Sequence, residues 1–172
     1  MRILNREIAL NGLLIALGVV LPIAFHQIHT AAGRIFLPMH IPVLLAGILL
    51  GPISGLIVGL ISPTLSFLLT GMPPAYAVPL MTLELIFYGS ASGIAIRKLR
   101  LPLIAGLILA MLVGRLGFAL ALFVLGRFVQ LPYDITYFII YAIPTGIPGI
   151  ALQIVLIPLL VRGINLASRT KI

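Results

Sequence analysis

The sequence contains no cysteine and only three acidic residues among its 172 positions. The absence of cysteine excludes disulfide bonds and thiol chemistry. The acidic residues Glu7, Glu84 and Asp134 are too widely separated to form the carboxylate clusters that bind catalytic metals. The chain also lacks a phosphate-binding loop and any serine–histidine spacing typical of catalysis. We therefore expect neither an enzyme nor an ATPase, and no cofactor is indicated.

Charged side chains are scarce, at 8% of the chain, whereas 62% of the residues are hydrophobic. Such a chain cannot cover a soluble surface, but it suits a lipid bilayer. The net charge of +8 does not indicate nucleic-acid binding, because the basic residues flank apolar segments and form no single patch. No linker divides the sequence, so we expect one integral-membrane domain over residues 1–172.

Six apolar segments are long enough to cross a membrane, which needs about 20 residues per helix. We expect an all-α membrane protein with spans at approximately residues 8–25, 37–50, 53–69, 75–96, 101–125 and 135–161. No small-residue cleavage site follows the first segment, so it is interpreted as a retained span. The second segment is short, and we expect it to be tilted or partly irregular.

The basic residues predict the orientation of these spans. Eight of the eleven lie at the chain ends or in one short loop, namely Arg2, Arg6, Arg97, Lys98, Arg100, Arg162, Arg169 and Lys171. Lysine and arginine concentrate on the cytoplasmic side of membrane proteins. Six spans place all three groups on that side, with both termini cytoplasmic and with Arg34 and Arg127 in outer loops.

Glu84 and Arg115 are the only charged residues well inside the predicted spans. Each lies about 14 to 15 Å from the outer end of its helix, so the two side chains can meet. A charge at this depth costs at least about 2.5 to 3.5 kcal/mol unless it is paired. One interpretation is a structural ion pair. The other is a ligand site in which Arg115 binds a carboxylate or phosphate and Glu84 orients it.

Aromatic and histidine residues gather near the predicted outer ends of the spans. Tyr133, Tyr137 and Tyr141 recur every four residues, as in an interfacial aromatic belt or a stacking wall of a pocket, to which Tyr88 is a further candidate. Prolines and glycines follow at 144–149 and predict a broken helix of the kind that lines binding sites. We expect His26, His29 and His40 at the outer face. Without cysteine or a nearby carboxylate, a metal site is not favoured.

Small residues recur every four positions in two segments. Gly47, Gly51, Gly55 and Gly59, which we assign to the third span, form the pattern that lets helices approach closely, and this favours internal packing over a sliding contact with a partner. In the first span, Gly12 and Ala16 share a stripe, with Ala9 close to the same face. Either an internal helix or an external partner can dock there.

The sequence from Phe36 to Gly47 resembles the substrate-binding S components of energy-coupling factor (ECF) vitamin transporters. The resemblance continues through Leu50-Gly51-Pro52, Gly55, Gly59, Ser62-Pro63 and Leu68 to Pro74. It is densest over residues 36–93, and the six-span layout extends it over the whole chain.

The resemblance implies a high-affinity binding subunit for a vitamin or related micronutrient in a prokaryotic cell membrane. Such a subunit associates with a transmembrane T component and two cytoplasmic ATPases, which supply the ATP hydrolysis. The family docks on the T component through a small-residue motif in the first span, which corresponds here to Gly12 and Ala16, with Ala9 nearby.

The resemblance also implies site residues. The loop at about 26–37 is expected to gate the pocket, and the last three spans to form its walls. This favours ligand-binding roles for Glu84, Arg115, Tyr88, Tyr137 and Tyr141.

Arg115, Arg34 and the histidines, including His40, favour an anionic ligand. Pantothenate is the first choice, and folate, riboflavin, cobalamin precursors, biotin and a queuosine precursor remain open. Two other functions are alternatives: a structural membrane scaffold of similar fold, and a stand-alone secondary transporter.

The charge pattern makes a direct prediction about topology. In this cysteine-free chain, Lys98→Cys should react with an impermeant thiol reagent only from the cytoplasmic side. Gln130→Cys, in the predicted outer loop, should react only from outside. Labelling of position 98 in intact cells would overturn the orientation.

Overall fold

The computed structural model describes residues 2–29, 31–128, 130–132 and 134–169. Within these ranges the chain forms helices joined by short loops. In chain order they are α1 (Arg2–Ile28), α2 (Ala32–Phe36), α3 (His40–Leu50), α4 (Pro52–Thr70), α5 (Val78–Gly93), the π-helical turn η1 (Ile94–Lys98), α6 (Leu103–Leu125), α7 (Ile135–Tyr137), the π-helical turn η2 (Phe138–Ala142), α8 (Ile143–Thr145) and α9 (Ile147–Arg169).

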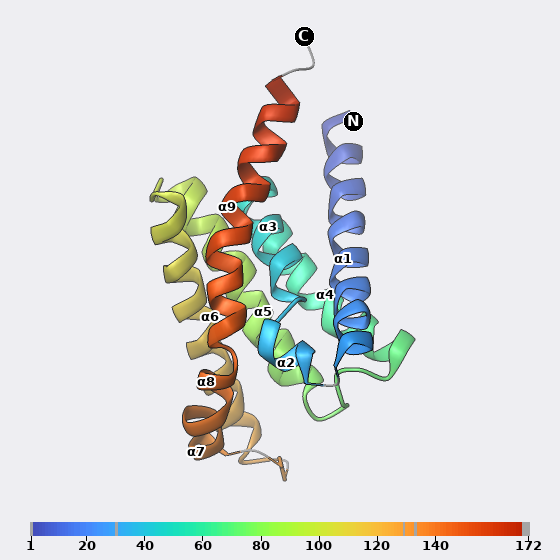
Figure 1. Ribbon diagram of the computed structural model, residues 1–172, viewed down its shortest axis with the longest axis vertical. Helices are drawn as coiled ribbons and strands as arrows, with labels where there is room; N and C mark the ends of the chain where they lie inside the picture. Colours follow the sequence, from blue (N-terminus) through green and yellow to red (C-terminus); the bar gives the residue numbers. More distant parts are fainter. Residues whose placement is uncertain (1, 30, 129, 133, 170–172) are drawn as a thin grey trace.

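The prediction of an all-α membrane protein is confirmed. Among the described residues, six helical stretches are long and apolar enough to cross a membrane: Asn5–Ile28, Ala32–Leu50, Pro52–Thr70, Val78–Lys98, Leu103–Leu125 and Ile147–Ile164. Figure 1 shows α1 beginning and α9 ending at the same end of the bundle. That this end faces the cytoplasm stays a prediction from the basic residues.

The predicted sixth span, 135–161, is wrong at its start. Ile135–Thr145 is a separate, shorter apolar helical stretch, and the membrane-crossing stretch begins at Ile147. The helix is interrupted at Gly146, whose N–H donates to the carbonyls of Ala142 and Ile143. Pro148 has no N–H and therefore cannot continue the regular pattern of helical hydrogen bonds.

The second span is irregular, as its length predicts. It consists of α2 and α3, separated by a break at Leu37, which has a left-handed backbone conformation with φ of 51°. Pro38 follows and restricts the preceding residue away from the α-helical region. Helix α3 is the most enclosed element, because every residue from His40 to Ile48 is buried.

The glycine repeat packs α3 and α4 against α5. A side chain at Gly55 would overlap the backbone of Gly89, and one at Gly59 would overlap the backbone at Leu85. The internal-packing interpretation is therefore confirmed. The assignment of all four glycines to one span is wrong, since Gly47 belongs to α3 and Gly51 lies in the α3–α4 junction with φ of 117°.

Helix α1 packs through one face and exposes the other. On the packed face, Leu14 and Val19 are buried, and the Asn11 Nδ2 donates to the Ser54 Oγ of α4 at 3.2 Å. On the other face Ala9, Gly12 and Ala16 are exposed, and a side chain at Gly12 would meet no atom within 4 Å. The small-residue stripe is thus not used in packing against the described residues.

The two kinds of small-residue surface should respond differently to an added methyl group. Gly55→Ala should lower the free energy of unfolding by about 1 to 3 kcal/mol, because the helix backbones must separate. Gly12→Ala is the matched control, and its stability should be unchanged or slightly higher. Thermal unfolding in detergent measures both, and equal stability of the two variants would contradict the close α4–α5 contact.

Candidate functional site

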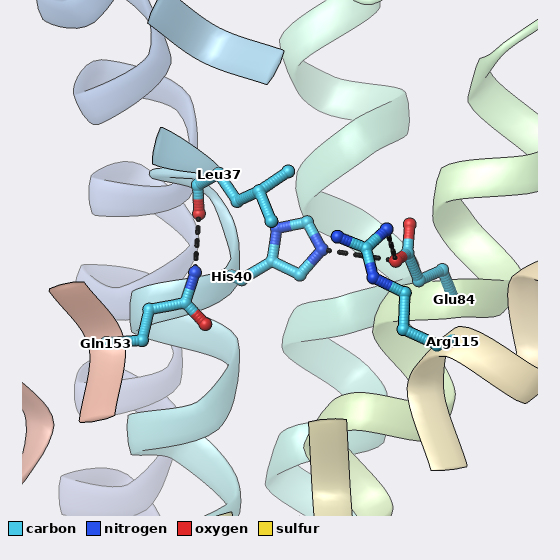
Figure 2. A network of polar contacts seen from close by, with 5 residues as sticks. All are labelled: Leu37, His40, Glu84, Arg115 and Gln153. Atoms are coloured by element: carbon cyan, nitrogen blue, oxygen red, sulfur yellow. Dashed lines mark hydrogen bonds and ion pairs between the residues drawn. The ribbon is translucent and has the colours of Figure 1, made fainter. Parts of the chain in front are cut away.

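The two intramembrane charges meet, as their depth predicts. The Arg115 Nη1 of α6 donates to the Glu84 Oε1 of α5 at 2.9 Å (Figure 2). Glu84 is 3% exposed and Arg115 is 15% exposed. The pair therefore sits inside the bundle, where the low dielectric strengthens its attraction and penalises either charge alone.

His40, the first residue of α3, joins this pair. Its Nε2 lies 3.6 Å from the Glu84 Oε1, which is beyond hydrogen-bond length. Its ring meets the fully buried Tyr88 edge-on, with ring centroids 4.8 Å apart. The Tyr88 ring in turn packs on Gly114 of α6. We call His40, Glu84, Tyr88 and Arg115 the Glu84 cluster.

The expected place of His40 at the outer face is wrong. The side chain is only 1% exposed, because α3 begins at His40 and carries it directly into the core. His26 and His29 lie apart from it at the end of α1, where the His29 Nδ1 accepts a hydrogen bond from the Ala31 N–H. The break at Leu37 and Pro38 separates His40 from His26 and His29, although the sequence places all three within 15 residues.

Several polar atoms of the Glu84 cluster are buried without a hydrogen-bond partner among the described residues. They are both ring nitrogens of His40, Nε and Nη2 of Arg115, and Oη of Tyr88. Leaving a buried polar group unbonded costs about 1 to 3 kcal/mol, so most folded proteins avoid it. Their concentration around one carboxylate marks this cluster as a candidate site for a polar ligand.

The α2 segment, which we define as Ala32–Leu37, joins this cluster at His40, whose backbone N–H donates to the Leu37 carbonyl, and it is attached to α9. The Leu37 carbonyl accepts a hydrogen bond from Nε2 of the fully buried Gln153 at 3.3 Å (Figure 2). The backbone at Ile35 and Phe36 lies so close to Gly149 that a side chain there would overlap it.

Gly146 lies against both the Arg115 guanidinium and the Leu37 side chain. The sequence indicates a broken helix at 144–149 but does not reveal that Leu37 packs on it. Only the restriction that Pro38 places on Leu37 hints at a special conformation there.

The α2 segment is also attached to α1. The Phe25 and Phe36 rings lie 5.5 Å apart, and Gly33 packs against His26. The segment therefore bridges the first and last long helices.

The other predicted ligand-binding residues lie outside the Glu84 cluster. Tyr137 and Tyr141 stack on each other with ring centroids 5.4 Å apart, and Tyr141 is 59% exposed. Arg34 is exposed on α2. Tyr133 lies outside the described residues.

A cavity of about 560 Å³ lies between the end of α6 and α7, away from the Glu84 cluster. Its charged residues already have partners. The Arg127 guanidinium lies 4.6 Å from the centre of the Phe123 ring, and the Asp134 Oδ1 accepts a hydrogen bond from the Tyr137 N–H at 2.7 Å. The Glu84 cluster, with its unpartnered buried atoms, is the stronger candidate site.

A comparison with protein-family models matches residues 6–161 to the ECF transporter, substrate-specific component. The chain belongs to this family. It is therefore a multi-pass cell-membrane protein and the substrate-binding subunit, or S component, of an ECF transporter. No curated protein and no solved structure gives a significant match.

Family membership also defines the type of protein. S components are transport subunits and not enzymes, and ATP hydrolysis belongs to their partners. The family implies a small-molecule substrate and association with a T component and ATPases. The resemblance to ECF S components, which rests on Phe36 to Gly47 and the glycine pattern, is thereby confirmed at the level of the family.

Proposed function

We propose that this S component binds a small carboxylate-bearing vitamin at the Glu84 cluster, with pantothenate as the first choice. The observation that carries the proposal is the incomplete hydrogen bonding of the Arg115 guanidinium. Its Nη1 donates a hydrogen bond to Glu84, whereas Nε and Nη2 have no hydrogen-bond partner among the residues that the structure describes. These two nitrogens form one edge of the guanidinium, and such an edge binds a carboxylate through two parallel hydrogen bonds.

Glu84 has a positioning role in this proposal. Its bond to Nη1 fixes the guanidinium plane, so the unpartnered edge is already oriented when a carboxylate arrives. Tyr88 and His40 offer further hydrogen-bonding atoms beside it. In this proposal the α2 segment moves to admit the ligand, because Leu37 packs on Gly146, which lies against the Arg115 guanidinium. The peripheral Tyr137, Tyr141 and Arg34 belong, in this proposal, to the entry path.

The proposal includes energised delivery. The S component would hand its ligand to a module of one T component and two ATPases, to which it docks through Ala9, Gly12 and Ala16. The exposure of these residues supports the assignment, because a surface without internal packing is free for a partner helix.

A structural membrane scaffold is the second candidate. The observation in its favour is that Glu84 and Arg115 already form an ion pair, which stabilises the fold without any ligand. A stand-alone secondary transporter would take up substrate without the ATPases, so uptake assays with and without the module separate it from the S component function.

Vitamin binding can be tested by thermal stabilisation of the purified protein. A ligand at 100 times its dissociation constant should stabilise a reversible fold by about 2.7 kcal/mol. We expect a carboxylate-bearing vitamin, pantothenate first, to do so. Arg115→Ala should weaken that binding by about 100-fold or more, since two charge-assisted hydrogen bonds are lost.

Arg115→Lys keeps the charge but loses the two-pronged geometry, so it should also bind weakly while remaining folded. Arg127→Ala removes an arginine outside the Glu84 cluster and should bind as the unmodified protein does. Unchanged affinity in both Arg115 variants would reduce Arg115 to a structural role. A well-folded sample that no vitamin stabilises would favour the scaffold.

If the stripe on α1 is the docking surface, a substitution there should impair assembly with the T component without changing ligand binding. Gly12→Leu places a bulky side chain on the exposed stripe, so co-purification with the T component should fall strongly. Ligand affinity should not change, because a side chain at Gly12 meets no other part of the described chain. Leu13→Ala, on the exposed part of the same helix, is a control for general changes to α1. Full assembly of Gly12→Leu would place the docking surface elsewhere.

A further inference from the structure

The Glu84 cluster contains one carboxylate, one guanidinium and one imidazole that can accept a proton. Among the described residues that form it, Glu84 contributes one negative charge and Arg115 one positive charge, so the cluster is neutral while the His40 imidazole is uncharged. Neither nitrogen of the imidazole has a hydrogen-bond partner in the described part of the chain. A charged imidazole there would add an uncompensated positive charge beside Arg115, which a buried site resists.

A carboxylate bound to Arg115 changes this balance. The buried cluster would then carry one net negative charge, and an unpaired charge at membrane depth is unfavourable. One additional proton restores neutrality. The His40 Nε2, 3.6 Å from the Glu84 Oε1, is the group placed to accept it, because the resulting imidazolium would form an ion pair with that carboxylate.

We infer that this S component takes up its carboxylate ligand together with one proton, which His40 receives. The inference rests on the proposed function. In the bound state the charges alternate: ligand carboxylate, Arg115 guanidinium, Glu84 carboxylate, His40 imidazolium. The proton comes from hydronium or a buffer acid in the bulk solution: its bond to that donor breaks, an N–H bond forms on the His40 ring nitrogen, and the conjugate base stays in solution. The ligand and the proton together therefore add no net charge to the cluster.

Within the described ranges, the helices around His40 supply no other charge that would restore neutrality. Helix α5 presents Glu84 and Tyr88 to it, and α6 presents Arg115. Helix α9 presents the uncharged Gln153 on the Leu37 side (Figure 2). Helix α4 has no titratable residue, and in α1 the titratable side chains lie near its two ends. The net charge around His40 therefore depends on Glu84, Arg115 and the bound ligand.

Calorimetry of ligand binding tests the inference in the unmodified protein. Pantothenate, or the carboxylate-bearing vitamin that stabilises the protein if pantothenate does not, is titrated at one pH in phosphate and in Tris buffer. The difference in binding enthalpy between the buffers gives the number of protons taken up, and we expect about one. When the titration is repeated at higher pH values, the dissociation constant should rise by about tenfold per pH unit.

Variants identify the groups responsible. Glu84→Gln removes the internal anion, so the ligand carboxylate alone neutralises Arg115; proton uptake should disappear and affinity should lose its pH dependence. His40→Gln should weaken binding by tenfold or more and abolish the uptake at neutral pH. His29→Gln removes a histidine outside the cluster, and its proton uptake should equal that of the unmodified protein.

The outcomes separate this inference from the proposed function. Tight binding of a carboxylate vitamin with no proton uptake, or with uptake unchanged in His40→Gln, would overturn the inference and leave the proposed function standing. Binding of only uncharged vitamins would also overturn it. Failure of every vitamin to bind a folded sample would overturn both.

Discussion

The buried ion pair between Glu84 and Arg115 is the constraint on which the rest of the structure depends. A membrane tolerates a charge at this depth only beside its opposite, so α5 and α6 must keep the register in which the two side chains meet. Close packing through Gly114 brings Tyr88 into the same place, and the start of α3 adds His40. One electrostatic requirement thus fixes three helices relative to one another and concentrates the chemistry of the protein at their junction.

The parts of this fold that the sequence predicts follow from one-dimensional patterns. Hydropathy gives the apolar segments, and counting residues from the helix ends gives the equal depth of Glu84 and Arg115. The four-residue glycine repeat gives close packing, although it does not show that the repeat crosses the α3–α4 junction at Gly51. These predictions succeed because helix rise and bilayer thickness convert sequence separation directly into depth.

The parts that sequence reasoning misses depend on where a helix breaks. His40 follows Pro38 by two residues, and whether that proline ends a helix or lies in its first turn decides whether the histidine faces water or the core. The same ambiguity misplaces the start of the last span, where Pro144, Gly146 and Pro148 permit several breaks. The contact of Leu37 with Gly146 joins residues more than 100 positions apart, and no local pattern encodes it.

The attachment of the α2 segment to α1 through Phe25 and Phe36 has a mechanical consequence. Helix α1 carries the exposed small-residue stripe on one side and holds this segment at its end, so it acts as a lever common to both. A rotation of α1 that buried the stripe against another helix would also act on Phe36 and, through the chain, on Leu37, which packs on Gly146 beside Arg115. Helix α1 and the α2 segment thus connect the exposed stripe with the surroundings of Gly146 and Arg115 through a continuous set of contacts.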